Sequence, residues 1–422
     1  MVFKGISIHK GCVVIKKRNI VVSLDIGSSR IKAAMGEVNF GEDIHILAIT
    51  TVDSQGLRKG NIIDIETASR SIDECLHKLE RMAGVEISNA LVGYSGSSIN
   101  TLNNRAVVAV GNSNYEITPE DKARVLQSAR NVALPLDRCV VQTIERQYII
   151  DGYDGVNDPV GMVGSRLEAE VTIVIAATAA VQNLQRSTGR IDLQIDQLVY
   201  NPILAAESVL LPAEKEMGVA LIDIGGGTTD ISYFEGGHLL CASVLPVGGD
   251  YITRDLAIVL KTSLEDAAKI KEKDGVAGPS QASSDIMITV HNLHGKEVRQ
   301  VSQQVIADII YARIVEMMEM IYAELKQFEC LDKIPGGIVL TGGGAHLVGI
   351  EEIMEDYMDI TVRLGIPENM RGVQSDINRP DYATVIGGLI YSGKNIDIRY
   401  ENKHGVSGLF NKVNYWLREF FG

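Results

Sequence analysis

Two segments of the chain share a pattern of residues that suits the binding of phosphate. Residues 24–32 read LDIGSSRIK and residues 222–230 read IDIGGGTTD, so each is an apolar strand that ends in Asp-Ile-Gly, a few small residues and a returning strand. Glycine allows backbone N–H groups to approach a phosphate closely, and serine and threonine hydroxyls can add donors. The pattern therefore predicts two phosphate-binding turns. The glycines and hydroxyl residues concerned are Gly27, Ser28, Ser29, Gly225, Gly226, Gly227, Thr228 and Thr229.

The aspartate of each turn can serve a metal ion. Asp25 and Asp223 both stand at the end of a predicted strand, where a carboxylate can hold hydrated Mg²⁺. A repeat of this kind indicates two related lobes that face one ligand. Either segment taken alone is equally compatible with an ordinary β-turn, and only the pair with matched flanks favours a clamp around phosphate and Mg²⁺.

A third glycine turn follows a strand near the end of the chain. Residues 337–350 read GIVLTGGGAHLVGI, in which Gly342, Gly343 and Gly344 are expected to open a helix and to lie flat beneath a nucleoside base. A Rossmann site is disfavoured because no GxGxxG follows the first strand, and no GxxxxGK[ST] sequence of a P-loop is present.

Several further elements must hold these turns in place. Short strands are predicted at residues 20–24, 31–38 and 44–51, and apolar residues at helical spacing predict a helix over residues 64–82 that Gly84 ends. Thr118 followed by Pro119, and Ser263 followed by Asp266, are typical helix starts. A long amphipathic helix is expected from about residue 301 to residue 328.

Composition limits the possible functions. The 422 residues carry a net charge of −14, which argues against a nucleic-acid-binding protein. The five cysteines form no CxxC pair, which favours reduced thiols rather than a disulfide framework. The basic residues 1–19 are expected to be a disordered lead-in, because their apolar run is too short for a signal peptide.

The order of the three turns resembles that of the actin superfamily, and within it the chain closely resembles the FtsA family of bacterial cell division. VSLDIGSSRIK, ALIDIGGGTTDIS, GGIVLTGGGAHLVGI and an amphipathic C-terminus carry the resemblance over about residues 20–422. It implies an α/β, actin-like two-lobed fold with duplicated mixed β-sheet cores, a small inserted α+β subdomain and a C-terminal amphipathic helix. The implied units are a first lobe (20–85 and 169–200), an inserted subdomain (86–168), a second lobe (201–248 and 331–393) with its own subdomain (249–330), a linker (394–407) and a terminal helix (408–422).

The resemblance also implies roles for individual residues. ATP and Mg²⁺ are the implied cofactors, with Lys32 reaching the phosphates. Lys271 and Glu272 resemble residues that approach the adenine and ribose, although the match is short and a solvated run of charges is the favoured alternative. Filament ATPases of the superfamily place Glu or Gln where Asn201 stands here, and Asn cannot act as a general base. Weak or absent ATP hydrolysis is therefore expected, unless Glu207 takes that place instead.

The end of the chain combines aromatic residues with helical spacing. Seven large apolar residues of segment 408–422 share one helical face, which suits the plane of a membrane interface. A helix docked on its own protein or on a partner remains the alternative. The seven residues are Leu409, Phe410, Val413, Trp416, Leu417, Phe420 and Phe421.

The resemblance implies a scaffold rather than a metabolic enzyme. It implies a polymer that tethers FtsZ to the cytoplasmic face of the membrane at the division site, with later division proteins bound through the inserted subdomain. Arg299 and Arg313 are candidates to contact the acidic C-terminal peptide of FtsZ, or else are solvated or paired within the chain. A sugar or metabolite kinase of the same fold is the alternative. An Hsp70-like chaperone is disfavoured, because about 70 residues follow the adenosine turn.

Overall fold

A computed structural model describes residues 4–9, 12–17, 19–38, 44–293, 298–368, 370–372 and 377–401. The terminal segment 408–422, with its predicted membrane helix, lies outside these described residues. Among the described helices, none is both long enough and apolar enough to cross a bilayer.

The first lobe is built on a six-stranded sheet in the order β13-β8-β3-β4-β5-β21. The predicted short strands are confirmed as an antiparallel meander, to which β8 adds in parallel beside β3. The bounds are β3 (Asn19–Ile26), β4 (Arg30–Val38), β5 (His45–Asp53), β8 (Asn89–Tyr94), β13 (Gln194–Tyr200) and β21 (Arg371–Gly372), with the small hairpin β6 (Leu57–Arg58) and β7 (Asn61–Ile62) beside them.

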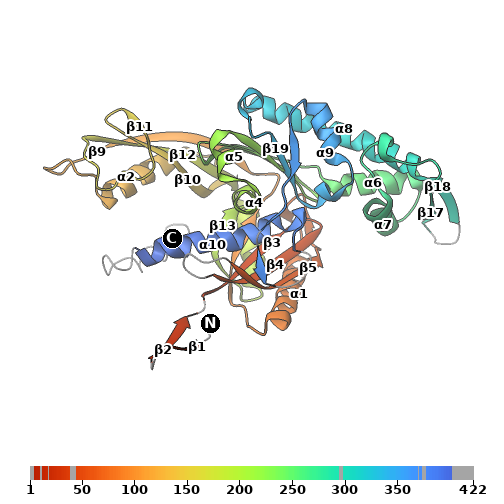
Figure 1. Ribbon diagram of the computed structural model, residues 1–422, viewed down its shortest axis with the longest axis horizontal. Helices are drawn as coiled ribbons and strands as arrows, with labels where there is room; N and C mark the ends of the chain where they lie inside the picture. The colour runs from red at the N-terminus through yellow and green to blue at the C-terminus, as the bar shows by residue number, and fades with distance from the viewer. Residues whose placement is uncertain are drawn as a thin grey trace.

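Helices cover both faces of this sheet (Figure 1). Alternate residues of β4 point to opposite faces: Ala33 and Met35 pack in the cluster that contains α1 (Ile65–Ala83), and Ala34 packs against α10 (Ala383–Glu401). The helix predicted at residues 64–82 is α1, with Asp64 as its N-cap. The first lobe also contains α3 (Thr178–Gly189), and α4 (Asn201–Val209) and α5 (Pro212–Met217) follow β13.

The second lobe repeats the arrangement of the first. Its meander is β14 (Val219–Ile224), β15 (Thr229–Glu235) and β16 (His238–Leu245), and β19 (Ile338–Thr341) adds in parallel beside β14 as β8 does beside β3. The duplicated cores expected from the repeated motif are therefore present. The sheet order is β11-β10-β12-β9-β16-β15-β14-β19-β20, and it ends at β20 (Val362–Leu364).

The inserted subdomain extends the same nine-stranded sheet. Its four strands join the second-lobe meander through a single pair, Asn100 of β9 with Ser243 of β16. The helix α2 (Pro119–Arg130) covers them, and Thr118 and Asp121 form the expected capping box at its start. The strands are β9 (Asn100–Ala109), β10 (Arg138–Ile150), β11 (Tyr153–Val156) and β12 (Arg166–Ala177), so the insert runs past the predicted boundary at residue 168, whereas β8, predicted within the insert, belongs to the first-lobe sheet.

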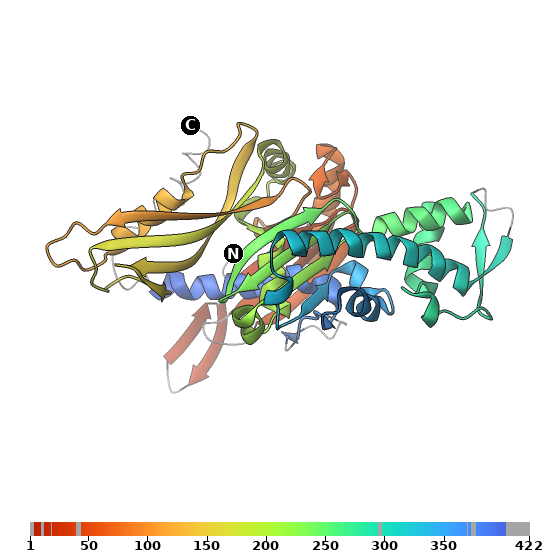
Figure 2. The ribbon, with the colours of Figure 1, turned by 90° about the horizontal axis from the view of Figure 1, so that it is seen from above.

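The second-lobe subdomain lies at the far end of the molecule from the inserted one (Figures 1 and 2). Its long helix α8 (Gln303–Gln327) begins two residues later than predicted, and the helix that follows Ser263 is confirmed as α7 (Leu264–Asp274). The other elements of this subdomain are α6 (Gly249–Leu260) and the hairpin of β17 (Met287–His291) and β18 (Val298–Ser302). The helix α9 (Ile350–Met358) lies between β19 and β20 in the core of the second lobe.

Three predictions about local structure were wrong. Part of residues 1–19 forms a hairpin of β1 (Lys4–His9) and β2 (Cys12–Lys17), whose register pairs Ile6 with Ile15 and Ile8 with Val13, residue types that favour strands. The glycines after β19 open a short 3₁₀ helix, Gly343–His346, and α9 begins only after Gly349. Residues 394–401 continue α10 and are not a linker.

The place of α10 also differs from the prediction. Residues 383–393 are predicted to belong to the second lobe, but α10 packs on β3, β4 and β8 of the first-lobe sheet as well as on α4, so it belongs to the first lobe. The chain returns to the first lobe at β21, which pairs with β5, and then contacts the second lobe again at the short 3₁₀ helix Pro380–Tyr382, where the Gly342 N–H donates to the Pro380 carbonyl. This crossing segment, residues 379–382, lies beside the predicted binding turns.

Candidate functional site

The three predicted turns line one cavity between the two lobes. The cavity measures about 810 Å³ and receives the ends of β3 and β14, the turn after β19, the end of α7 and the 3₁₀ helix Pro380–Tyr382. The predicted residues that line it are Asp25, Gly27, Ser28, Ser29, Lys32, Asn201, Asp223, Gly225, Gly226, Thr228, Lys271, Glu272, Gly342, Gly343 and Gly344.

The two Asp-Ile-Gly turns have the same backbone geometry. The N–H of Gly27 donates to the carbonyl of Arg30 at 3.1 Å, and the N–H of Gly225 donates to that of Thr228 at 2.9 Å. The turns also touch: a Cβ added at Gly226 would lie 1.8 Å from Ser29 Oγ. Glycine at this position therefore lets the two loops close on each other across the cleft.

The two aspartates of the turns are buried in the cavity, and Asp25 lies close enough to affect the ionisation of Asp223. Asn201 Nδ2 donates to Asp25 Oδ1 at 3.1 Å, and Thr384 Oγ1 donates to Asp223 Oδ2 at 3.5 Å. Burial raises the pKa of both carboxyls, that of Asp223 to about 6, and the charge of Asp25 contributes to this rise. Two crowded carboxylates of this kind are suited to a cation that neutralises both.

The third turn needs glycine for two reasons. Gly342 has a φ of +86°, which side-chain-bearing residues rarely adopt, and a Cβ there would lie 2.1 Å from Asp223 Oδ1. Gly344 packs in the same way on Ile224. The glycines thus bring this turn against the end of β14, where it forms one wall of the cavity.

The predicted charge run reaches the cavity from α7. Lys271 Nζ donates to the carbonyl of Gly249 at 3.0 Å and to Thr253 Oγ1 at 2.8 Å, and burial lowers its pKa. Glu272 Oε1 lies 3.9 Å from Arg30 Nη2, so this pair spans the two lobes. The structure thus brings both residues of the run to the site, whereas a purely solvated run would lie away from it.

Two predicted residues do not line the cavity. Thr229 is fully buried and its Oγ1 donates to the carbonyl of Val247 at 2.9 Å, so it supports the turn from behind. Gly227 packs against Ser28 instead. The alternative to Asn201 is also outside the cavity: Glu207 pairs with Lys215 at 2.9 Å and with Lys394.

Sequence reasoning missed several polar residues of the cavity. Asp230 pairs with Asp223 directly across the β14–β15 ladder and accepts a hydrogen bond from Ser95 Oγ. Asp250 accepts from Ser29 Oγ at 2.7 Å, and Asp381 and Arg379 enter from the crossing segment. Of these residues, only Asp230 could have been predicted from the sequence. Six residues separate it from Asp223, and a tight hairpin over that spacing places the two aspartates opposite each other.

The buried Asp230 leads to a prediction about pH. Burial and the neighbouring Asp223 raise the pKa of Asp230 to about 8, so the folded chain holds this proton more tightly than the unfolded chain. The free energy of unfolding should therefore fall as the pH rises from about 4 to about 8. At about pH 8, Asp230→Asn is expected to raise the free energy of unfolding by about 1–2 kcal/mol, and at about pH 4 to leave it nearly unchanged.

Urea denaturation at both pH values measures this difference. The exposed Asp154→Asn is the control and should shift neither value. Equal effects of Asp230→Asn at the two pH values would contradict a raised pKa at this site.

The two arginines proposed for a partner lie on the second-lobe subdomain, outside the cavity. Arg313 makes a two-pronged ion pair with Asp255, with distances of 2.6 and 3.0 Å, and Arg299 donates to the carbonyl of Leu260. The pairing of Arg313 within the chain is thus present in this structure. Any partner peptide would have to compete with Asp255 for this guanidinium.

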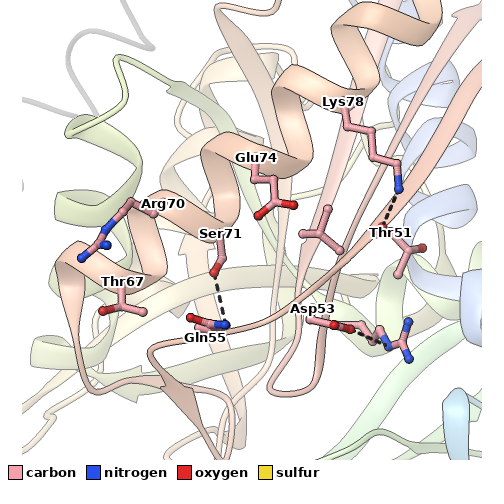
Figure 3. A pocket seen from close by; sticks show the side chains of 10 residues that line it. Thr51, Asp53, Gln55, Thr67, Arg70, Ser71, Glu74 and Lys78 are labelled. Atoms are coloured by element: carbon pink, nitrogen blue, oxygen red, sulfur yellow. Dashed lines mark hydrogen bonds and ion pairs between the residues drawn. The ribbon is translucent and has the colours of Figure 1, made fainter.

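A second hollow of about 510 Å³ lies between α1 and β5, outside the cleft between the lobes (Figure 3). Two hydrogen bonds join its walls: Lys78 Nζ donates to the carbonyl of Thr51 at 3.1 Å, and Ser71 Oγ accepts from the N–H of Gln55 at 3.3 Å. It contains none of the predicted site residues, so the cavity between the lobes is the stronger candidate.

Comparison with protein families gives two matches. A model described as cell division protein FtsA matches residues 220–387, and one described as an SHS2 domain inserted in FtsA matches residues 96–175. Cell division protein FtsA of Pseudomonas aeruginosa is 37% identical over 89% of this chain and 90% of its own length. FtsA of Bacillus subtilis is 38% identical over 90% of this chain and 85% of its own length. FtsA of Escherichia coli K12 is 30% identical over 96% of this chain and 99% of its own length.

Solved structures show the same fold at lower identity. A PilM–PilN type IV pilus biogenesis complex contains a chain with a TM-score of 0.63 and 18% identity, covering 88% of this chain and 98% of that one. MreB5 of Spiroplasma citri bound to ADP has a TM-score of 0.55 and 14% identity, covering 91% and 99%. These likenesses confirm the actin-like fold.

Proposed function

Because the chain belongs to the FtsA family of cell division proteins, we propose that it is an actin-like scaffold that binds ATP with Mg²⁺ and tethers FtsZ filaments to the cytoplasmic membrane. The observation that carries the nucleotide part of this proposal is the cavity between the lobes. There, two matched Asp-Ile-Gly turns and a glycine turn meet.

The residues present fit a nucleotide with its metal ion. The turns at Gly27 and Gly225 would hold the phosphates, Asp25 and Asp223 would hold hydrated Mg²⁺, and the turn at Gly342 would lie against the adenosine. Asn201 Oδ1 is buried and accepts no hydrogen bond from the described residues, so it is free to bind a ligand or a water. The related fold of MreB5, in structures described as bound to ADP and AMPPNP, supports this assignment.

Slow or absent ATP hydrolysis is part of the proposal. Asn201, the first residue of α4, stands at the place proposed for positioning the attacking water. Its amide cannot take a proton from that water, and Glu207 is held away by two lysines. The nucleotide would then act mainly to set the conformation and assembly of the chain.

The proposed membrane contact is the terminal segment 408–422. Its seven large apolar residues would enter the lipid interface, where full burial of each contributes about 1.5–3 kcal/mol before the cost of ordering the helix. A single copy would bind reversibly, and many copies on one filament would bind persistently through effective concentration. The position of the chain at the inner face of the membrane, at the division site, follows from this tether.

Two further contacts complete the proposed scaffold. The C-terminal peptide of FtsZ would bind the second-lobe subdomain near Arg299 and Arg313, where a partner carboxylate could replace Asp255. Later division proteins would bind the inserted subdomain, which forms one end of the molecule (Figure 2).

Co-sedimentation with liposomes tests the tether. The full chain is expected to pellet with anionic vesicles, and more completely with ATP and Mg²⁺, because a filament presents many helices at once. A chain that ends at residue 407 should remain in the supernatant in both conditions. Equal pelleting of the two chains would remove the proposed membrane contact.

Point variants separate the apolar face from the mere presence of the segment. Trp416→Glu places a charge on that face and should abolish pelleting, because a charged side chain resists burial in the interface. Asn411→Glu adds the same charge on the opposite face of the predicted helix and should reduce pelleting much less.

A further inference from the structure

Asp381 contacts three basic side chains at the edge of the cavity, those of His346, Arg379 and Lys32. Its side chain is only 11% exposed. His346 Nε2 lies 2.7 Å from Oδ1 and Arg379 Nε lies 2.9 Å from the same atom, and Lys32 Nζ lies 3.7 Å from Oδ2. Burial by itself would raise the pKa of Asp381, but these neighbours outweigh it and hold the pKa far below its usual range, so the carboxylate is charged.

The contact with Lys32 crosses the cleft. Lys32 lies on β4 of the first lobe, directly opposite Asp25 in the β3–β4 ladder, and its Nζ also donates to the backbone carbonyl of Asp381. Asp381 is fixed to the other side, because the carbonyl of Pro380 accepts from the N–H of Gly342 at 3.2 Å and from Thr341 Oγ1 at 3.0 Å. The lysine proposed to reach the phosphates is therefore paired with a carboxylate anchored to the third turn.

A phosphate and a carboxylate compete for the same ammonium group. Lys32 makes two contacts with Asp381 and is largely buried, with 12% of its side chain exposed, so a bound phosphate would have to take it over from that partner. Asp381 also adds a negative charge to a cavity that is already lined by the carboxyl groups of Asp25, Asp223 and Asp250. Both effects oppose the binding of an anion at the Lys32 end of the cavity.

We propose that Asp381 holds Lys32 while the cavity lacks a nucleotide and releases it to a phosphate group of the ligand. Asp381 thus limits the affinity of the site for phosphate-bearing ligands without affecting the recognition of the nucleoside. This inference rests on the proposed nucleotide site. It adds Asp381 as a residue that determines how much the phosphate groups contribute to the affinity for the nucleotide.

Calorimetric titration of the full chain with ATP and with adenosine, both with Mg²⁺, tests this. Asp381→Asn keeps the shape of the side chain and removes its charge, so ATP is expected to bind about tenfold more tightly and adenosine to bind within about twofold of the original value. Asp381→Ala should act in the same direction. Glu319→Gln removes one exposed charge far from the cavity and should change neither affinity.

A variant that lacks Lys32 shows whether Asp381 competes with phosphate for the Lys32 ammonium group or acts only through its negative charge. In Lys32→Met, the further change Asp381→Asn should no longer tighten ATP binding, because the contested ammonium is gone. Weaker ATP binding by both Asp381 variants, a gain shared equally by adenosine, or a gain that persists without Lys32 would overturn the inference. Failure of the unaltered chain to bind ATP would instead overturn the proposed function and the inference with it.

Discussion

A chain with Asp223→Asn is expected to bind ATP about 100-fold less tightly than the unaltered chain when Mg²⁺ is present. Asp223 and Asp25 line the same cavity, and burial together with the charge of Asp25 raises the pKa of Asp223, so a hydrated cation between them would relieve their repulsion. The amide of Asn has the same shape but supplies no negative charge to the hydrated ion.

The sign of the effect should reverse without the metal. In EDTA, Asp223→Asn is expected to bind ATP at least as tightly as the unaltered chain, since the variant removes a carboxylate that repels the phosphates. Glu74→Gln, in the hollow between α1 and β5, is the matched control and should leave both affinities unchanged. A loss of affinity of equal size with Mg²⁺ and with EDTA would show that Asp223 does not act through a cation.

The second large effect is expected from the packing of α10 on α4. Gly387 lies so close to α4 that an added Cβ would stand 1.7 Å from the carbonyl oxygen of Leu204. Backbone atoms cannot move aside as a flexible side chain can, so Gly387→Ala should separate the two helices. The free energy of unfolding is expected to fall by about 3 kcal/mol or more, as measured by urea denaturation.

A second helical glycine provides the control for this substitution. Gly189, at the end of α3, has nothing within 4 Å of its would-be Cβ and no left-handed backbone, so Gly189→Ala should be neutral or stabilise by up to about 1 kcal/mol. If Gly387→Ala were equally harmless, α10 would not lie against α4, and the assignment of α10 to the first lobe would fail.

Local signals in the sequence were sufficient for the turns and for most helix ends. The Asp-Ile-Gly segments, Thr118 with Pro119, and Ser263 act through neighbours within a few residues, so their geometry depends little on the rest of the chain. The repeat of one motif also predicted two lobes that face each other. The matched hydrogen bonds of Gly27 and Gly225 confirm that the two turns are equivalent.

The parts that could not be predicted depend on contacts between distant residues. Nothing near Asp381 or Asp250 in the sequence marks them as members of the cavity, since their partners Lys32 and Ser29 are more than 200 positions away. Likewise, Ala383–Glu401 could be assigned to a lobe only once its packing was known, because an apolar helix face is compatible with either core. The sequence thus revealed which residues can bind a phosphate, and tertiary packing decided which charges surround that phosphate, because electrostatic partners are chosen by distance in space.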